Sequence, residues 1–196
     1  GSRLLVQESI HDEFVDKLVA FAKTAEMGDP MSLDTQIGPV TTMPQFEKIL
    51  GYLDVAKDEG AECVLGGARA ERPECGDGWF VEPTIFTGVR NDMRIAQEEV
   101  FGPVLSVIPF KDDDEAVEIA NDVVYGLAAG VWTSSINRAL EIPKRLQAGT
   151  VWVNKHGELD PGIPFSGAKQ SGVGTELGRA GFEEFTQRRV INISTS

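Results

Sequence analysis

The sequence predicts an α/β domain whose largely parallel sheet is covered by helices on both faces. Strand-like and helix-like patterns alternate along the 196 residues, and such alternation implies crossover connections between parallel strands. The composition, 41% hydrophobic and 25% charged, is ordinary for a globular protein with a sizeable core. The chain has no internal repeat and no low-complexity tract, so a single α/β domain is the simplest prediction.

The first predicted strand is the short apolar run of residues 4–7. Ser9 then offers an N-cap for a helix, and apolar residues at helical spacing continue to Ala25. Gly28 and Pro30 are typical of the end of such a helix. A polar connection leads from this helix to the next one.

The second predicted helix has Pro44 in its first turn and Gly60 as its C-terminal cap. Residues 68–78 are rich in Gly and Pro and predict a turn-rich excursion. Strand-like runs lie on either side of this excursion, at residues 61–65 and 79–86, and a further one covers residues 104–110.

The second half of the chain continues the alternation. Helical patterns cover residues 112–120, 134–147 and 177–186, and Pro143 is expected to kink the middle one. Strand-like runs cover residues 128–133, 150–154 and 190–193. The acidic run 112–115 lacks the spacing of a calcium loop and fits the negative charge favoured at a helix N-terminus.

Composition excludes several classes of partner. Eighteen Lys and Arg against 31 Asp and Glu give a formal net charge of −13, which argues against nucleic acid and anionic membrane surfaces. No apolar run approaches the roughly 20 residues that span a bilayer. The two cysteines, Cys63 and Cys75, form no C-x-x-C pair, and the histidines are not clustered. We therefore expect no metal site and a reducing, cytoplasmic setting.

The segment 154–176 breaks the regular alternation. It carries several glycines and prolines and begins at the end of a predicted strand, where open α/β sheets place their ligands. A loop of this length in a domain is typically functional or disordered. A binding role for this loop is therefore our first functional hypothesis.

Two sequence clusters invite a catalytic interpretation. The glycines of 172–178 nearly match a dinucleotide fingerprint, but the last spacing is one residue too long and no strand is predicted before them. Turns before a helix are the favoured interpretation. The adjacent carboxylates Glu98 and Glu99 could serve acid–base chemistry, and solvent-facing side chains are the favoured alternative.

The cysteines and histidines do not suggest a nucleophile or a triad. Cys63 lies in a predicted strand with alternating apolar residues and is expected to be buried. The acidic residues beside Cys75 are expected to raise the pKa of its thiol. His11 is expected to be exposed in the first turn of a helix. His156 lies in the long loop, but a lone histidine supports neither a triad nor a metal site.

Five ordered motifs resemble the aldehyde dehydrogenase family. They are GSR (1–3), QEEVFGPV (97–104), YGLA (125–128), AGTVWVN (148–154) and PFSGAKQSG (164–172). The resemblance is collinear from the first residue to the last. It implies that residues 1–187 belong to the catalytic domain and that residues 188–196 form an oligomerisation strand.

The resemblance also implies roles for individual residues. Glu99 corresponds to the carboxylate that binds the nicotinamide ribose hydroxyls, and Phe101 to the aromatic packed by the nicotinamide half. Gln45 and Lys48 correspond to helix positions that contact the ribose and phosphates. The substrate-pocket residues are Phe165, an aromatic wall of the tunnel, with His156 and Leu159 on the same loop. Glu176 matches a glutamate proposed as a proton relay.

The family's reaction is the NAD(P)-dependent oxidation of an aldehyde to a carboxylic acid through a cysteine thioester. In that family the nucleophilic cysteine stands just before Gly-Ser-Arg, so this chain by itself is expected to be inactive and to bind no NAD or NADP. The expected partners are a small aldehyde and further copies of the chain, as a dimer or tetramer. The alternative is a non-catalytic homologue or stable fragment with a structural or binding role.

Overall fold

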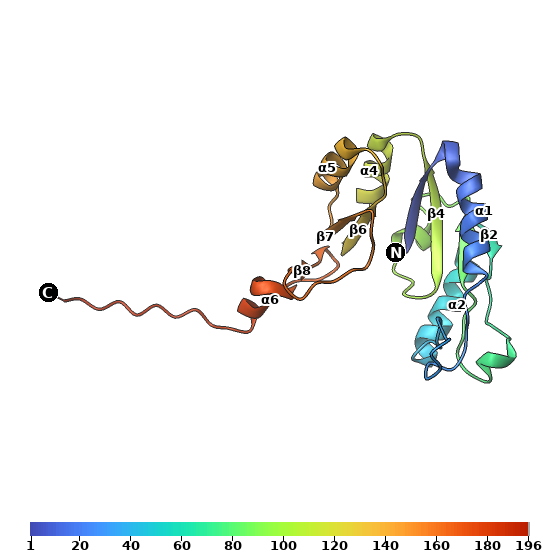
Figure 1. The fold of residues 1–196 in the computed structure, drawn as a ribbon. Coiled ribbons are helices and arrows are strands. Elements are labelled where there is room, and N and C mark those ends of the chain that lie inside the picture. The colour runs from blue at the N-terminus through green and yellow to red at the C-terminus, as the bar shows by residue number, and fades with distance from the viewer. Residues whose placement is uncertain (196) are drawn as a thin grey trace. The chain divides into compact units, whose positions relative to one another are not determined.

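A four-stranded mixed sheet in the order β1-β4-β3-β2 forms the centre of the first of two units, residues 1–116 (Figure 1). The structure is a computed structural model, and it describes residues 1–195. Strands β1 (Arg3–Gln7), β4 (Val104–Phe110) and β3 (Thr84–Thr87) are parallel, and β2 (Glu62–Leu65) is antiparallel to β3. The predicted α/β class is confirmed, with one antiparallel edge.

Helices cover both faces of this sheet. One face is covered by α1 (His11–Ala22), where Val15 and its apolar neighbours pack against Val6, Ile85 and Val107. The alternate residues of β3 and β4 point the other way because successive strand residues face opposite sides. On that second face Ser106 Oγ donates to the carbonyl of Ile95 at 3.5 Å, in the one-turn helix α3 (Arg94–Gln97).

Helix α2 (Met43–Asp58) follows its sequence signals closely. Thr42 Oγ1 caps it by accepting from the Gln45 N–H at 3.4 Å, and Pro44 lies in the first turn. Its buried residues recur at helical spacing, namely Phe46, Ile49, Leu53 and Ala56. Gly60 follows the helix with a φ of +93°, as a C-terminal cap requires.

Three predictions in this unit need correction. Ser9 is not an N-cap, because it lies within the 3-10 turn η1 (Glu8–Ile10), and α1 ends at Ala22 instead of Ala25. The strand predicted for residues 79–86 is limited to β3 and an isolated bridge at Val81, because Pro83 has no N–H to donate to a ladder. Sequence reasoning also missed α3, which is a single turn.

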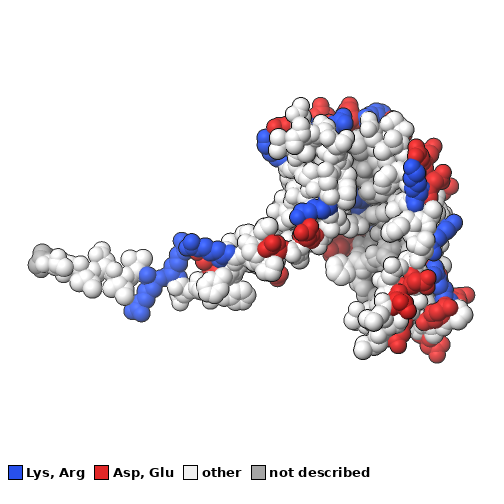
Figure 2. Space-filling view, viewed as in Figure 1, with Lys and Arg blue, Asp and Glu red and all other residues white. Residues whose placement is uncertain are grey.

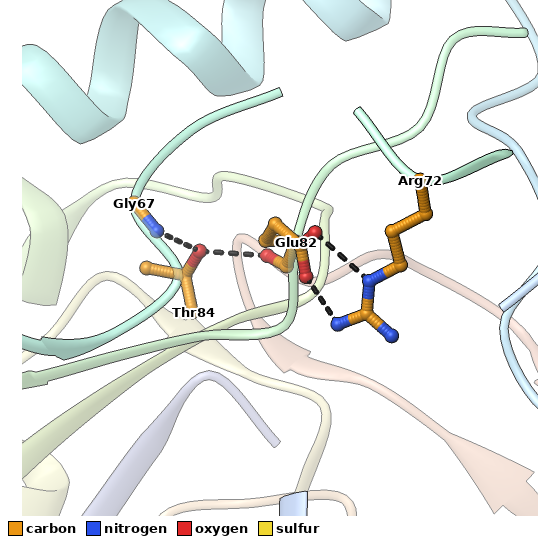
Figure 3. A network of polar contacts seen from close by, with 4 residues as sticks. All are labelled: Gly67, Arg72, Glu82 and Thr84. Carbon is orange, nitrogen blue, oxygen red and sulfur yellow. Dashed lines mark hydrogen bonds and ion pairs between the residues drawn. The ribbon is translucent and has the colours of Figure 1, made fainter. Parts of the chain in front are cut away.

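A polar network holds the turn-rich excursion onto the sheet (Figure 3). Buried Thr84 accepts from the Gly67 N–H at 2.9 Å and donates to the Glu82 carbonyl at 2.7 Å. The Glu82 carboxylate binds Arg72 in a two-point ion pair, at 3.0 and 2.6 Å. At Gly66, with φ +68°, a Cβ would lie 2.3 Å from the Pro83 carbonyl oxygen, so only glycine fits where β2 ends. The excursion also contains the 3-10 turn η2 (Pro73–Cys75).

The second unit begins at Val117, within α4 (Asp113–Asn121). Asp112 Oδ1 caps α4 by accepting from the N–H groups of Asp114 and Glu115, both at 3.0 Å. The predicted helix-end role of this acidic run is therefore confirmed.

Parallel strands β6 (Ala128–Val131) and β7 (Thr150–Val153) are joined through α5 (Ile136–Arg145), as the crossover prediction requires. Ser135 caps α5, and Pro143 lies in its last turn. Strand β5 (Tyr125–Gly126) pairs with β9 (Ala168–Lys169), and β8 (Phe165–Ser166) pairs with β10 (Thr175–Glu176), both antiparallel. The loop 154–176 therefore contains short paired strands that the sequence did not predict.

The chain ends in helix α6 (Gly178–Glu184) and an extended segment (Figure 1). Gly172, Gly174 and Gly178 have positive φ in the approach to α6, which confirms that these glycines supply turns before a helix. Residues 187–195 contain no strand in the single chain, so the strand predicted at residues 190–193 is not observed. Residue 196 lies outside the described residues.

Candidate functional site

The segment 99–101 is held by two side chains of α2. Gln45 Nε2 donates to the carbonyls of Val100 at 2.8 Å and Phe101 at 3.1 Å. Lys48 Nζ donates to the carbonyl of Glu99 at 2.8 Å. The structure thus brings together the four cofactor residues that the resemblance assigns, although Gln45 and Lys48 contact the segment's main chain.

In this arrangement the side chains of Glu99 and Phe101 remain exposed to solvent. Glu99 is exposed, and among residues 1–195 its carboxylate makes no hydrogen bond or ion pair. Phe101 is 76% exposed and has φ +56°. An open carboxylate beside an exposed aromatic ring fits a ligand that offers hydroxyl donors next to a flat group.

Glu98, in contrast, is occupied within the protein. Arg94 donates to both of its carboxylate oxygens, at 2.8 and 3.0 Å, and the Tyr52 hydroxyl donates to it at 2.5 Å. The pKa of the Glu98 carboxyl is lowered to about 2, mainly by the hydrogen bond from the Arg94 guanidinium and next by that from the Tyr52 hydroxyl. The hydrogen bond to Glu98 raises the pKa of Tyr52. The solvent-facing interpretation is therefore correct for Glu99 and holds only in part for Glu98, whose side chain is 41% exposed but is bound by Arg94 and Tyr52.

In the second unit, Phe165 and Glu176 lie side by side. They are register partners in the antiparallel pair of β8 and β10, although eleven positions separate them in the sequence. The Phe165 side chain is half-buried and Glu176 is exposed. The next residue, Leu177, has φ +62° and ψ 171°, a conformation that is disfavoured for any residue with a side chain.

His156 and Leu159 lie on the loop that leads from β7 to β8. The His156 ring meets Trp152 edge-on, with centroids 5.3 Å apart and an interplanar angle of 72°. Trp152 is buried and donates through Nε1 to the Glu158 carbonyl at 3.0 Å. Leu159 is 54% exposed. This loop is therefore anchored by Trp152 and offers an apolar side chain to solvent.

The expectation for His11 was wrong, and that for Cys75 was right in direction but not in its main cause. His11 is half-buried where exposure was expected: its Nδ1 lies 2.8 Å from Asp12 Oδ1, and its buried Nε2 has no partner within the described residues. The pKa of Cys75 is raised, as predicted, but chiefly because the thiol is buried. Cys63 is half-buried and donates to the Leu65 carbonyl at 3.2 Å. Neither cysteine has the setting of a nucleophile.

The aldehyde dehydrogenase family model matches residues 1–191 of the chain. The chain belongs to this family. It is 45% identical to a betaine aldehyde dehydrogenase of Bacillus subtilis, a match that covers 100% of this chain and 40% of that protein. It is 45% identical to a putative aldehyde dehydrogenase-like protein of Schizosaccharomyces pombe, covering 99% of this chain and 38% of that protein.

Solved structures of the family show the same fold. A structure of Staphylococcus aureus betaine aldehyde dehydrogenase in complex with NAD+ matches with a TM-score of 0.92 and 41% identity, covering 100% of this chain and 41% of that one. The chain thus spans about 40% of the length of these aldehyde dehydrogenase relatives.

Family membership leaves several residues of the site unexplained. Glu98 is bound by Tyr52 and Arg94, and Glu59 accepts from the Arg94 N–H, beside the segment that carries Glu99. The family resemblance assigned none of these four residues a role. The sequence signal for two of them is the spacing of Tyr52 and Glu59 from Gln45 and Lys48, which places these four positions on one side of α2 and its C-terminal cap.

Residues 1–195 contain no helix with the length and apolar character to cross a membrane. They also contain no group of three or more His, Cys, Asp or Glu side chains arranged to hold a metal ion.

Proposed function

We propose that this chain is the part of an aldehyde dehydrogenase that positions the nicotinamide half of NAD+ and forms part of the aldehyde pocket. The complete protein would oxidise an aldehyde to a carboxylic acid. The observation that carries the proposal is the open Glu99 carboxylate, whose main chain Lys48 holds while its oxygens remain free for a ligand.

The chemistry of these residues fits a dinucleotide. An ionised carboxylate accepts two hydroxyl hydrogen bonds, which suits the vicinal hydroxyls of a ribose. The exposed Phe101 ring offers a flat apolar surface for a nicotinamide ring. Gln45 retains its amide oxygen and Lys48 retains further N–H donors beyond those used within the chain. When bound, the dinucleotide accepts a hydride from the substrate.

We assign NAD+ as the dinucleotide because related structures are complexes with NAD+. The nucleophile that the family resemblance implies is a cysteine N-terminal to Gly1. In the family's reaction its thiolate adds to the aldehyde carbonyl, hydride passes to the dinucleotide, and water hydrolyses the resulting thioester. Neither Cys63 nor Cys75 is assigned this role.

The aldehyde pocket is assigned to the second unit. We propose that Phe165 is an aromatic wall of this pocket and that His156 and Leu159 line its entrance. Glu176 is proposed as a proton relay because it is exposed and is the register partner of Phe165. Which aldehyde enters depends on this loop.

We further propose that residues 188–196 form an intersubunit strand in a dimer or tetramer. Val190, Ile191 and Ile193 are 90%, 71% and 76% exposed, which is unfavourable for an apolar segment in water. Figure 2 shows basic side chains near the start of this extended segment and mainly uncharged surface beyond them. A second copy of the chain would satisfy both its backbone groups and its apolar side chains.

The test of the proposed function is NAD+ binding by the complete protein and its Glu99→Gln variant. Loss of hydrogen bonds to a charged group costs about 1.5–3 kcal/mol, so the Kd for NAD+ should rise roughly 10- to 150-fold. Glu47→Gln, which neutralises an exposed carboxylate on the same helix as Gln45, is the matched control. The wild-type protein should also form NADH from aldehydes. An unchanged Kd in Glu99→Gln would refute the assignment of this residue.

A further inference from the structure

One side of α2 follows the segment 94–101 along its whole length. Gln45, Lys48, Tyr52 and Glu59 are spaced by three, four and seven positions, which aligns them along one face of a helix. We call these four residues the α2 polar stripe; Glu59 is the residue that caps the helix C-terminus.

The stripe meets the segment in reverse order. Glu59 Oε2 accepts from the Arg94 N–H at 2.8 Å, and Tyr52 donates to Glu98. Lys48 and Gln45 then donate to the carbonyls of residues 99–101. Every member of the stripe therefore contacts the segment, from the first residue of α3 to residues 99–101.

The Tyr52 ring is the centre of the charged part of this contact. The Arg94 guanidinium lies 5.7 Å from its centroid and Lys48 Nζ lies 5.8 Å from it. The Tyr52 hydroxyl and the Arg94 fork bind the Glu98 carboxylate from two directions. A planar fork that binds both oxygens fixes the orientation of the carboxylate as well as its position.

These contacts separate two neighbouring carboxylates. The Glu98 side chain is directed to α2 and α3 by Tyr52 and Arg94. At the next residue the carbonyl oxygen is bound by Lys48, and the Glu99 side chain is left exposed. Two residues later, Phe101 has a left-handed backbone conformation that costs energy and persists only where contacts impose it.

We propose that Tyr52, Arg94 and Glu98 are positioning residues for dinucleotide binding, which act by fixing the main chain that presents Glu99. The inference rests on the proposed function of Glu99. These residues do not contact the dinucleotide in this proposal. They restrict the main chain of Glu99 to the conformation that binds the ligand, so less conformational entropy is lost on binding.

The experiment compares NAD+ binding by calorimetry in the complete protein and in Arg94→Gln. Removing the Arg94 fork from the Glu98 carboxylate should raise the Kd for NAD+ about 3- to 10-fold, which lies at the lower end of the range for coupling between residues of one network. Arg94→Lys keeps the charge without the fork and should recover part of the affinity. The matched control is Arg90→Gln, which removes an exposed arginine whose ion pair with Asp92 lies outside the stripe.

A double variant separates positioning from a general structural effect. If Arg94 acts through Glu99, Arg94→Gln should add less than 2-fold to the Kd of Glu99→Gln, because interacting sites are not additive. The KM for the aldehyde at saturating NAD+ should be unchanged. If Arg94→Gln does not fold, Tyr52→Phe removes only a hydroxyl and should raise the Kd in the same direction.

The outcomes distinguish the two proposals. An unchanged Kd in Glu99→Gln would remove the proposed function, whatever the other variants do. The positioning role alone would be overturned by a different result: Glu99→Gln binds NAD+ more weakly, but Arg94→Gln and Tyr52→Phe bind it as tightly as the Arg90→Gln control. Full additivity in the double variant would also overturn it, because the effect would then not pass through Glu99.

Discussion

The substitution Gly102→Ala tests how tightly the cofactor segment is packed against α2. A Cβ at position 102 would lie 2.7 Å from Cδ1, 2.8 Å from Cγ1 and 3.2 Å from Cγ2 of Ile49. Ile49 is fully buried, and three of its side-chain atoms lie within 3.2 Å of the added Cβ, so its side chain cannot turn out into solvent to relieve the contact. The added methyl group therefore has to displace either α2 or the main chain beside Phe101.

The expected cost follows from these contacts. Inserting a methyl group into a well-packed site typically destabilises by about 1–3 kcal/mol. Displacement of residue 102 would also stretch the hydrogen bonds from Gln45 to the carbonyls of Val100 and Phe101. We therefore expect lower stability around α2 together with weaker NAD+ binding.

Hydrogen exchange of the α2 amides in the complete protein measures this effect. It reports the local opening free energy and does not require a large protein to unfold in one step. Ile49→Ala alone should cost about 2–5 kcal/mol through its cavity. In the double variant the new methyl group occupies part of that cavity, so the combined loss should be smaller than the sum by about 0.5–3 kcal/mol. Additive losses, or α2 protection unchanged by Gly102→Ala, would refute the packing argument.

Three further predictions concern other parts of the molecule. Phe165→Ala in the complete protein should shift preference toward bulkier aldehydes in a graded way, about 1–3 kcal/mol per methylene of altered fit; an identical ranking of kcat/KM values would exclude Phe165 from the pocket. Deletion of residues 188–196 from the complete protein should make its oligomer dissociate on dilution, seen as a lower molar mass by light scattering. An oligomer of unchanged size and stability would exclude the segment as the intersubunit strand. The pKa of the Glu98 carboxyl is lowered to about 2, so its ion pair stabilises the protein fully above the ordinary carboxyl pKa, about 4.3, and the contribution is lost as pH falls toward 2. The difference in local opening free energy at the α2 amides between wild type and Glu98→Gln, measured by hydrogen exchange in the complete protein, should therefore shrink between about pH 4.5 and 2; a difference that is constant over this range would contradict the role of Arg94 and Tyr52.

Local patterns were sufficient for the longer elements of the fold. The strand at 104–110 and the helix over 43–58 were predicted nearly to the residue. Apolar periodicity marks such elements, and Pro44 and Gly60 mark the helix ends, through the conformations of nearby residues alone. The two-residue strands could not be predicted. Tyr125 and Gly126 pair with Lys169 and Ala168, and runs this short have no period of their own.

By itself the sequence determined the α/β class, the main elements and, through five motifs, the resemblance to aldehyde dehydrogenases. It could not determine which of two adjacent glutamates remains open: Arg94 is a local partner four residues before Glu98, but the Tyr52 hydroxyl that completes the contact comes from a distant part of the chain. The structure decides this through Tyr52, whose hydroxyl reaches Glu98 across 46 positions of sequence. Only the packing of α2 against residues 94–101 brings those side chains within hydrogen-bonding distance, and so leaves Glu99 available to a ligand.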